Sequence, residues 1–253
     1  MKRLVVFILL VIGLTSCDVL QQAASGINTT GIPVPTSNPL TESEVISGLK
    51  DALRVSTDTA VSGLSTLNGF FGDAALKILL PPDAKIITDN LDNPVLKAIG
   101  VSQKVDDVIL RMNRSAEEAA AKATPIFVDA IRNMSITDAF GILKGSDTAA
   151  THYFRVNTYN ALYQQFKPVI TQYLDKDIVG SISTNEAWTT LTSAYNKAAR
   201  LSSSLTPVNT QLDDYVTKKT IHGVFVKVAE QEAQIRKDPV ARVTDILKRV
   251  FGS

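Results

Sequence analysis

The sequence predicts an all-α fold, a single bundle-like domain of long, kinked helices that follows a signal peptide and a flexible tether. Hydrophobic residues make up 45% of the chain but aromatic residues only 6%, and a core built mostly of Ala, Leu, Val and Ile favours helices over sheets. From Thr41 onward apolar residues recur every three or four positions, as on one face of a helix. No stretch shows the sustained alternation of apolar and polar residues that indicates a strand.

Residues 1–16 have the layout of a secretory signal peptide. Lys2 and Arg3 precede an apolar run from Leu4 to Leu14, and small residues follow. This run is roughly half as long as a membrane-spanning helix requires. A membrane anchor helix is the alternative reading of the same segment.

The stretch Leu14-Thr15-Ser16-Cys17 resembles the lipobox of bacterial lipoproteins, in which the cysteine is acylated and the chain is cut just before it. Cys17 is the single cysteine of the chain, so no disulfide can form within it. Acyl chains such as palmitate bind membranes through each buried methylene. We therefore expect a lipid-anchored protein of the bacterial cell envelope that faces the periplasm. Asp18 resembles a signal for retention at the inner membrane, and the choice between inner and outer membrane stays open.

Residues 17–40 are expected to form the lipidated cysteine and a flexible tether. Gly, Pro, Ser, Thr and Asn dominate residues 18–40, and no hydrophobic period persists there. Such a coil spans roughly 25 Å on average. The folded domain is expected to occupy residues 41–253 and to stand clear of the membrane surface.

The first half of the domain predicts two long helices. The first begins at a capping box formed by Thr41 and Glu44 and ends between Gly63 and Gly69. A break follows at residues 80–83, where Asp83 can cap a short helix, and Asn93-Pro94 suggests a restart that closes at Gly100. A second long helix should run over 102–133, with a kink or a restart at Pro125.

The second half is read from its helix caps. Ser135 and Asp138 form a capping box for a short helix to about Lys144, and Gly145 lies just past its end. The next helix is expected to begin at Ser146 or Asp147 and to continue past Pro168. Another should begin at the capping box of residues 183–186, and a long helix should cover 211–236. The last is expected to begin at Asp238-Pro239.

His152 is the candidate catalytic residue that stands out, because it falls in the first turns of a predicted helix. It could act as a base there, or it could be an ordinary surface or partly buried histidine. No nucleophile motif, phosphate loop or dinucleotide fingerprint accompanies it. With one cysteine and two histidines far apart, no metal site and no cofactor are expected. The formal net charge of +1 predicts no nucleic-acid-binding face.

Two polar runs on the two long helices suggest a shared polar cleft. Arg114 and Glu118 lie on one helix, Glu232 and Arg236 on the other, and His152 completes the candidate set. The alternative is that each pair is an ordinary ion pair one turn apart. The adjacent carboxylates 106–107, 117–118 and 213–214 are expected to lie on solvated helix faces, since neighbouring residues point about 100° apart.

Three stretches together resemble one bacterial family, the domain of unknown function 4197. They are GLKDALRVSTDTAV, the segment MNRSAEEAAAKATPIFVDAIRNMSITDAFGILKGSDTAATHYFR, and the C-terminal DDYVTKKTIHGVFVKVAEQEAQIRKDPVARVTDILKRVFG. The resemblance spans 41–252 and implies an exported or lipid-anchored helical domain. It implies no reaction and no catalytic residues.

These observations lead to two functional hypotheses. The first is a lipid-anchored, non-enzymatic binding or scaffolding module, which holds a partner protein or an apolar ligand at the membrane. The alternative is an envelope hydrolase that uses carboxylates or His152.

Overall fold

The fold is all-α, as predicted. The computed structural model describes residues 40–85, 101–176, 183–200, 207–209, 211–242 and 245–251, and these residues contain no β-strand. They belong to one compact unit, Leu40–Ser253. Its α-helices are α2 (Glu42–Leu64), α5 (Val101–Ala120), α6 (Ala123–Arg132), α7 (Ile136–Leu143), α8 (Ala149–Leu174), α9 (Thr184–Ala199), α10 (Leu212–Lys237) and α11 (Asp245–Phe251). Two short 3-10 helices, η1 (Pro82–Ala84) and η2 (Pro239–Ala241), complete the described elements.

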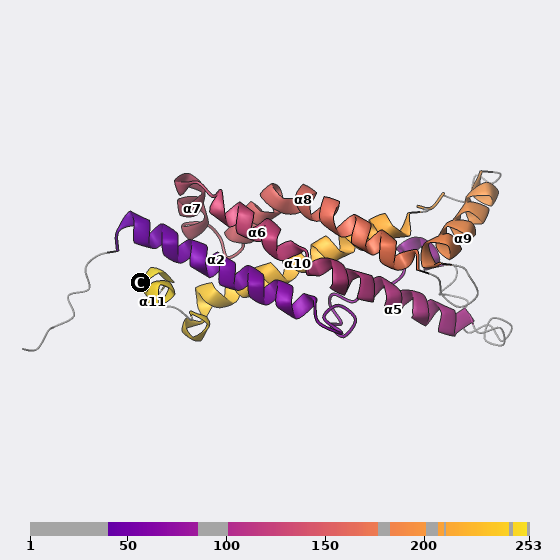
Figure 1. Ribbon diagram of the computed structural model, residues 1–253, viewed down its shortest axis with the longest axis horizontal. Coiled ribbons are helices and arrows are strands. Elements are labelled where there is room, and N and C mark those ends of the chain that lie inside the picture. The colour runs from indigo at the N-terminus through magenta and orange to yellow at the C-terminus, as the bar shows by residue number, and fades with distance from the viewer. Residues whose placement is uncertain are drawn as a thin grey trace, which may run out of the picture. The chain divides into compact units, whose positions relative to one another are not determined.

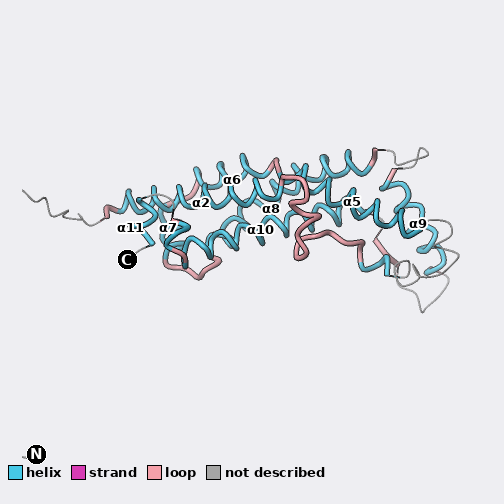
Figure 2. The backbone as a smooth tube through the Cα atoms, turned by 90° about the horizontal axis from the view of Figure 1, so that it is seen from below, coloured by secondary structure: helices cyan, strands magenta, loops and turns pink. Residues whose placement is uncertain are grey.

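The long helices of this unit lie side by side (Figure 1). Helix α10 contacts α8, α2 and α5, and α8 also packs along α5. The beginning of α2 lies at the same end of the unit as α7 and α11, whereas α9 lies at the opposite end. In Figure 2 the loop between α2 and η1 crosses the neighbouring helices near the middle of the unit. None of the described helices is both long and apolar enough to cross a membrane.

The centre of the core is an aromatic cluster from three helices. Phe127 of α6, Phe154 of α8 and Phe225 of α10 are buried. The ring of Phe127 meets that of Phe154 edge-on at 5.1 Å and that of Phe225 at 6.4 Å. Such aromatic pairs stabilise by more than their burial alone. They fix the positions of α6, α8 and α10 relative to one another.

Two of the predicted capping boxes are confirmed. The Thr41 hydroxyl accepts from the backbone N–H of Glu44 at 3.2 Å, and the Glu44 carboxylate accepts from the N–H of Thr41 at 2.8 Å. Ser135 and Asp138 make the same reciprocal pair at the start of α7. At α9 the Ser183 hydroxyl accepts from the N–H of Glu186 at 3.1 Å. Local signals of this kind need no tertiary information.

The prolines act as their positions predict. A restart is observed near Pro125, because α5 ends at Ala120 and α6 begins at Ala123. Pro125 thus lies in the first turn of α6, where its missing N–H removes no helical hydrogen bond. Helix α8 continues past Pro168, as expected.

Two predicted helix starts are wrong. Helix α8 begins at Ala149 after Thr148, which makes no side-chain cap, so neither Ser146 nor Asp147 caps it. Asp238 Oδ1 accepts from the N–H of Val240 at 2.9 Å, as a cap would, but Pro239 begins only the 3-10 helix η2, and the α-helix α11 begins at Asp245. The expectations for residues 1–39, including the signal peptide, Cys17 and the tether, and for the restart at 93–100 lie outside the described residues.

Candidate functional site

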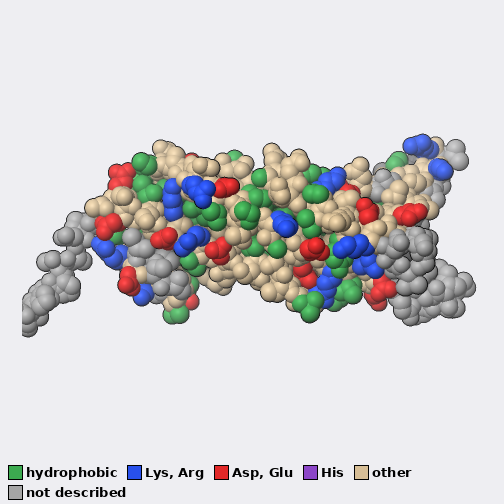
Figure 3. Space-filling model, in the orientation of Figure 1, with side chains coloured by type: hydrophobic (Ala, Val, Ile, Leu, Met, Phe, Trp, Pro, Cys, Tyr) green, Lys and Arg blue, Asp and Glu red, His purple; other side chains and the backbone are tan. Residues whose placement is uncertain are grey.

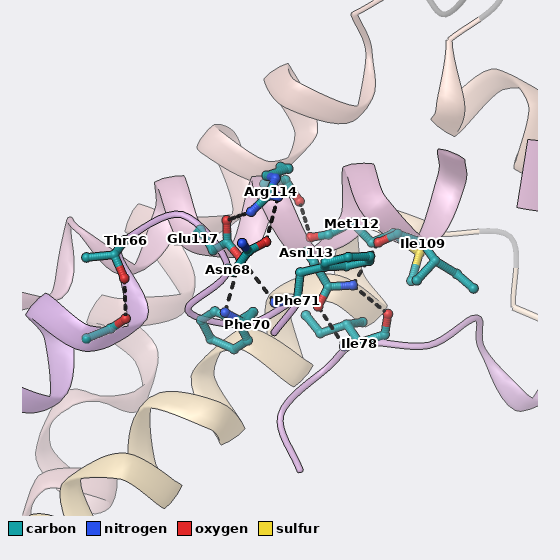
Figure 4. Close-up of polar contacts among 12 residues, drawn as sticks. Thr66, Asn68, Phe70, Phe71, Ile78, Ile109, Met112, Asn113, Arg114 and Glu117 are labelled. Carbon is teal, nitrogen blue, oxygen red and sulfur yellow. Dashed lines mark hydrogen bonds and ion pairs between the residues drawn. The ribbon is translucent and has the colours of Figure 1, made fainter. Parts of the chain in front are cut away.

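Helix α5 holds the loop that follows α2 through buried polar side chains (Figure 4). Glu117 is only 5% exposed, and its Oε1 accepts from the backbone N–H groups of Phe70 and Phe71, both at 3.1 Å. A buried carboxylate without partners would cost several kcal/mol. The two backbone donors and Arg114 supply the partners that Glu117 needs.

Asn113 holds the same loop further along. Its Oδ1 accepts from the N–H of Ile78 at 2.8 Å, and its Nδ2 donates to the carbonyl of Ile78 at 2.8 Å. The Nδ2 group also donates to the carbonyl of Ile109 at 2.7 Å. Asn113 is fully buried. Its amide therefore satisfies both backbone groups of a loop residue that has no strand or helix to pair with.

Arg114 closes the arrangement at the surface. Its guanidinium donates to Glu117 Oε2 at 2.6 Å and to Asn68 Oδ1 at 2.8 Å. Asn68 has a φ of 69°, in the left-handed region that Asn tolerates better than most residues. Arg114 thus fixes the side chain of the residue at which the loop turns.

The other side of the loop rests on α10. The ring of Phe70 fills the space beside Gly223, where a Cβ atom would come within 2.5 Å of Phe70 Cε1. Lys227 Nζ pairs with Asp73 Oδ2 at 2.8 Å and with Glu230 Oε2 at 2.9 Å. The hydrogen bond from Lys227 is the main cause that lowers the pKa of Asp73, and the same bond raises the pKa of Lys227.

An open groove of about 860 Å³ lies where this loop, the end of α2 and α10 meet. Its lining includes Leu67, Asn68, Asp73, Lys227 and Glu230. We call it the loop groove. Its charged side chains are already paired with one another, so none is set up as a general acid or base.

A second buried carboxylate caps α8 from a distance. Glu232 of α10 is 5% exposed and accepts from the N–H groups of Ala150 and Thr151, both at 2.9 Å. It also accepts from the Thr151 hydroxyl at 2.9 Å and pairs with Arg236 at 3.0 Å. Arg236 in turn donates to the carbonyl of Ile142 at the end of α7. The carboxylate complements the positive end of the α8 dipole, which explains why no local residue caps that helix.

Beside this cap, two hollows of about 700 and 390 Å³ follow α8 against α7 and α6. They share Asp138, Tyr153 and Asn157 in their linings. We call the pair the α8 groove. His152 lines it and is exposed. Burial and the negative charge of Asp138 raise the pKa of Tyr153, whose hydroxyl donates to the carbonyl of Ala130 at 3.0 Å.

The structure does not bring the residues of the proposed polar cleft together in one site. His152 is exposed in the α8 groove, beside the start of α8. Arg114 pairs with Glu117 and Asn68, while the neighbouring Glu118 is exposed. Glu232 and Arg236 form the expected ion pair one turn apart, at the start of α8. The loop held by Glu117 meets α10 at Gly223, nine residues before Glu232, which is roughly 13 Å along the helix axis.

The prediction that adjacent carboxylates are solvated is wrong for Glu117 and for Asp214. Asp214 is 8% exposed and accepts from the Tyr163 hydroxyl at 2.7 Å and from Lys218 at 2.8 Å. Burial acts to raise the pKa of Asp214, but these two hydrogen bonds together with the positive charges of Lys218 and Lys167 outweigh it and lower the pKa. Its neighbour Asp213 accepts from Thr171 of α8 at 2.8 Å. Both aspartates thus join α10 to α8.

The sequence does contain one indication of the α5 contacts. Asn113 and Glu117 are four residues apart, which puts both side chains on the same face of the helix.

The buried glutamates of the described residues have structural contacts. No group of three His, Cys, Asp or Glu side chains is placed to hold a metal ion within the described ranges. Both buried glutamates accept backbone hydrogen bonds and pair with an arginine of their own helix. On the face shown in Figure 3, acidic and basic side chains are interspersed.

Comparison with known proteins gives one match. No curated protein and no solved structure shows a significant similarity to this chain. The model of a family described as "Protein of unknown function (DUF4197)" matches residues 39–252, which is most of the chain. The chain therefore belongs to the DUF4197 family.

Proposed function

We propose that this protein is a lipid-anchored, non-enzymatic binding module of the bacterial cell envelope. The observation that carries the location is the sequence Leu14-Thr15-Ser16-Cys17 after a short apolar run. An acylated Cys17 holds the chain at the membrane, and residues 18–40 provide reach for the helical domain.

The binding role is supported by what the buried polar groups do. Glu117 and Glu232 stabilise loop and helix backbones, so neither carboxylate is available as an acid or base. The surface of the described residues contains the loop groove and the α8 groove, which are both open. Both linings include polar side chains, which would lose water without compensation beneath an acyl chain. The proposed ligand is therefore a hydrogen-bonding component of the envelope.

The alternative is a hydrolase in which His152 acts with a carboxylate. One observation favours it: Asp138 lines the same groove as His152. The Oδ2 atom of Asp138, however, accepts from both the N–H and the hydroxyl of Ser135 at the start of α7. A general base needs a free carboxylate or imidazole and a positioned water or nucleophile.

The two roles are separated by variants in cells that carry the intact gene. Cys17→Ala should block processing by the lipoprotein signal peptidase, leave the uncleaved precursor, and abolish the phenotype of the wild-type gene. His152→Ala and His222→Ala should leave that phenotype unchanged, because a binding module uses neither imidazole as a base. If either histidine variant loses function with normal abundance, the hydrolase role replaces the binding role.

A further inference from the structure

We propose that the α8 groove and the exposed face of α8 bind an uncharged, hydroxyl-rich chain, that is, a neutral glycan strand. The inference rests on the proposed binding role and adds the site and the chemical class of the ligand. It is carried by the chemistry of the exposed face of α8 and by the composition of the α8 groove.

The accessible face of α8 is rich in amides and poor in charge. The helix carries two formal charges over its described length, Arg155, which is exposed, and Lys167, whose side chain is 35% exposed. Lys167 Nζ lies 3.9 Å from Asp213 Oδ2 and 5.8 Å from the centroid of the Tyr163 ring. The Arg155 guanidinium lies over the ring of Phe225, 5.0 Å from its centroid. Five exposed positions carry amides: Asn157, Asn160, Gln164, Gln165 and Gln172.

Solvated helix faces usually carry charges, which make up about a quarter to a third of a protein surface. Helix α10 of this protein follows that pattern, since Lys218, Lys219, Glu230 and Lys237 are among its exposed residues. The two helices belong to the same domain, so both need a soluble surface, but only α10 meets that need mainly with charged side chains. The need for solubility therefore does not by itself explain the amides of α8.

The amides continue the groove along the helix. Positions four apart on α8 form two neighbouring rows, and adjacent members of a row are about 6 Å apart along the axis. One row contains the exposed His152, Val156, Asn160 and Gln164. The other begins at the half-buried Tyr153 and continues with the exposed Asn157, Ala161 and Gln165. The first residues of both rows line the α8 groove. The groove and the amides thus form one continuous surface.

The lining of the α8 groove disfavours anions. Neither of its hollows is lined by a Lys or Arg, the side chains that pair with phosphate or carboxylate, whereas both hollows contain Asp138. Its two carboxylates also have partners within the chain, since Asp129 accepts from Arg132 at 3.2 Å and Asp138 from Ser135. A cationic ligand would have to compete for them. An uncharged ligand needs no counter-charge.

The amides suit hydroxyl groups in particular. An Asn or Gln side chain offers two donors and an acceptor, and a hydroxyl can both donate and accept. Asn157 uses its Nδ2 to reach the carbonyl of Tyr153 at 2.8 Å, which orients its oxygen. A row of such groups matches a chain that presents hydroxyls at every unit, as a glycan does.

The experiment uses the full chain, purified in a sugar-free, non-ionic detergent from whichever cell fraction contains it, and titrated calorimetrically with a hexamer of N-acetylglucosamine. We expect saturable binding, weakened at least tenfold in the double variant Asn157→Ala/Asn160→Ala. The matched control is Gln234→Ala, an exposed amide of α10, which should change the affinity less than twofold. Alanine is the better helix former, so the thermal midpoint of the double variant should not fall.

Three results would overturn the proposal: no saturable binding below roughly 1 mM, equal weakening by Gln234→Ala, or tighter binding of hexalysine than of the oligosaccharide. The last would assign the face to a cationic partner. None of these results depends on whether Cys17 is acylated, so the anchor and the ligand class can fail separately.

Discussion

Replacing Glu232 by glutamine tests whether this residue caps α8 from α10. The carboxylate receives five hydrogen-bond contacts, from the N–H groups of Ala150 and Thr151, the Thr151 hydroxyl, and the Nε and Nη2 groups of Arg236. Breaking a buried ion pair costs about 3–5 kcal/mol because the partner charge is left uncompensated. The amide oxygen of glutamine can still accept hydrogen bonds from the α8 backbone. We therefore expect the free energy of unfolding to fall by about 3 kcal/mol, the lower end of that range.

The matched control is Glu230→Gln, two residues earlier on the same helix. The Glu230 side chain is 48% exposed and pairs with Lys227, and exposed pairs contribute about 0–1 kcal/mol. Urea unfolding of both variants, followed by far-UV circular dichroism and by the fluorescence of Trp188, the single tryptophan, measures the difference. Equal losses in the two variants would refute the remote cap.

Three further predictions concern packing, pH and His152. Gly223→Ala should lower the free energy of unfolding by about 1–3 kcal/mol, because the new Cβ meets the Phe70 ring. In Gly141→Ala the new Cβ meets nothing within 4 Å, so this control should raise the free energy of unfolding by about 0.5–1 kcal/mol. Similar thermal midpoints for the two variants would contradict this difference in packing. The pKa of Asp73 is lowered in the folded state, so its pairing with Lys227 stabilises the fold above the ordinary pKa near 4. This stabilisation is lost as pH falls through the folded-state pKa. In Asp73→Asn the free energy of unfolding should therefore fall less steeply as pH decreases, and an unchanged slope would contradict the pairing. His152→Ala should leave the free energy of unfolding, measured by urea unfolding, within about 0.5 kcal/mol of wild type, as for exposed residues in general. A larger loss would contradict the exposed position of His152.

The parts of the fold that sequence reasoning predicts correctly depend on local chemistry. Thr41 with Glu44 and Ser135 with Asp138 are each three residues apart, so the same residues that form the cap also reveal it. Pro125 likewise reveals a helix restart, because its effect is on its own backbone. Helix ends of this kind are visible without knowledge of neighbouring elements.

The missed features depend on residues that are far apart in the chain. The start of α8 was assigned to Ser146 or Asp147, but its cap is Glu232, more than 80 residues away. The spacing of one helical turn between Arg114 and Glu118 predicts that these two side chains pair with each other. The loop at Phe70 and Phe71, which draws Glu117 inward, is invisible in that local pattern. The same reason explains why Arg114 and Glu118 lie apart from Glu232 and Arg236.

The acylation of Cys17 is the most direct test of the proposed function. Intact-mass and peptide mass spectrometry of the protein purified from native membranes would identify its first residue and any modification. The account predicts a mature chain that begins at Cys17 and carries acyl chains, and no such species in the Cys17→Ala variant. A mature chain cut at another residue, or an unmodified Cys17 in the membrane fraction, would contradict it.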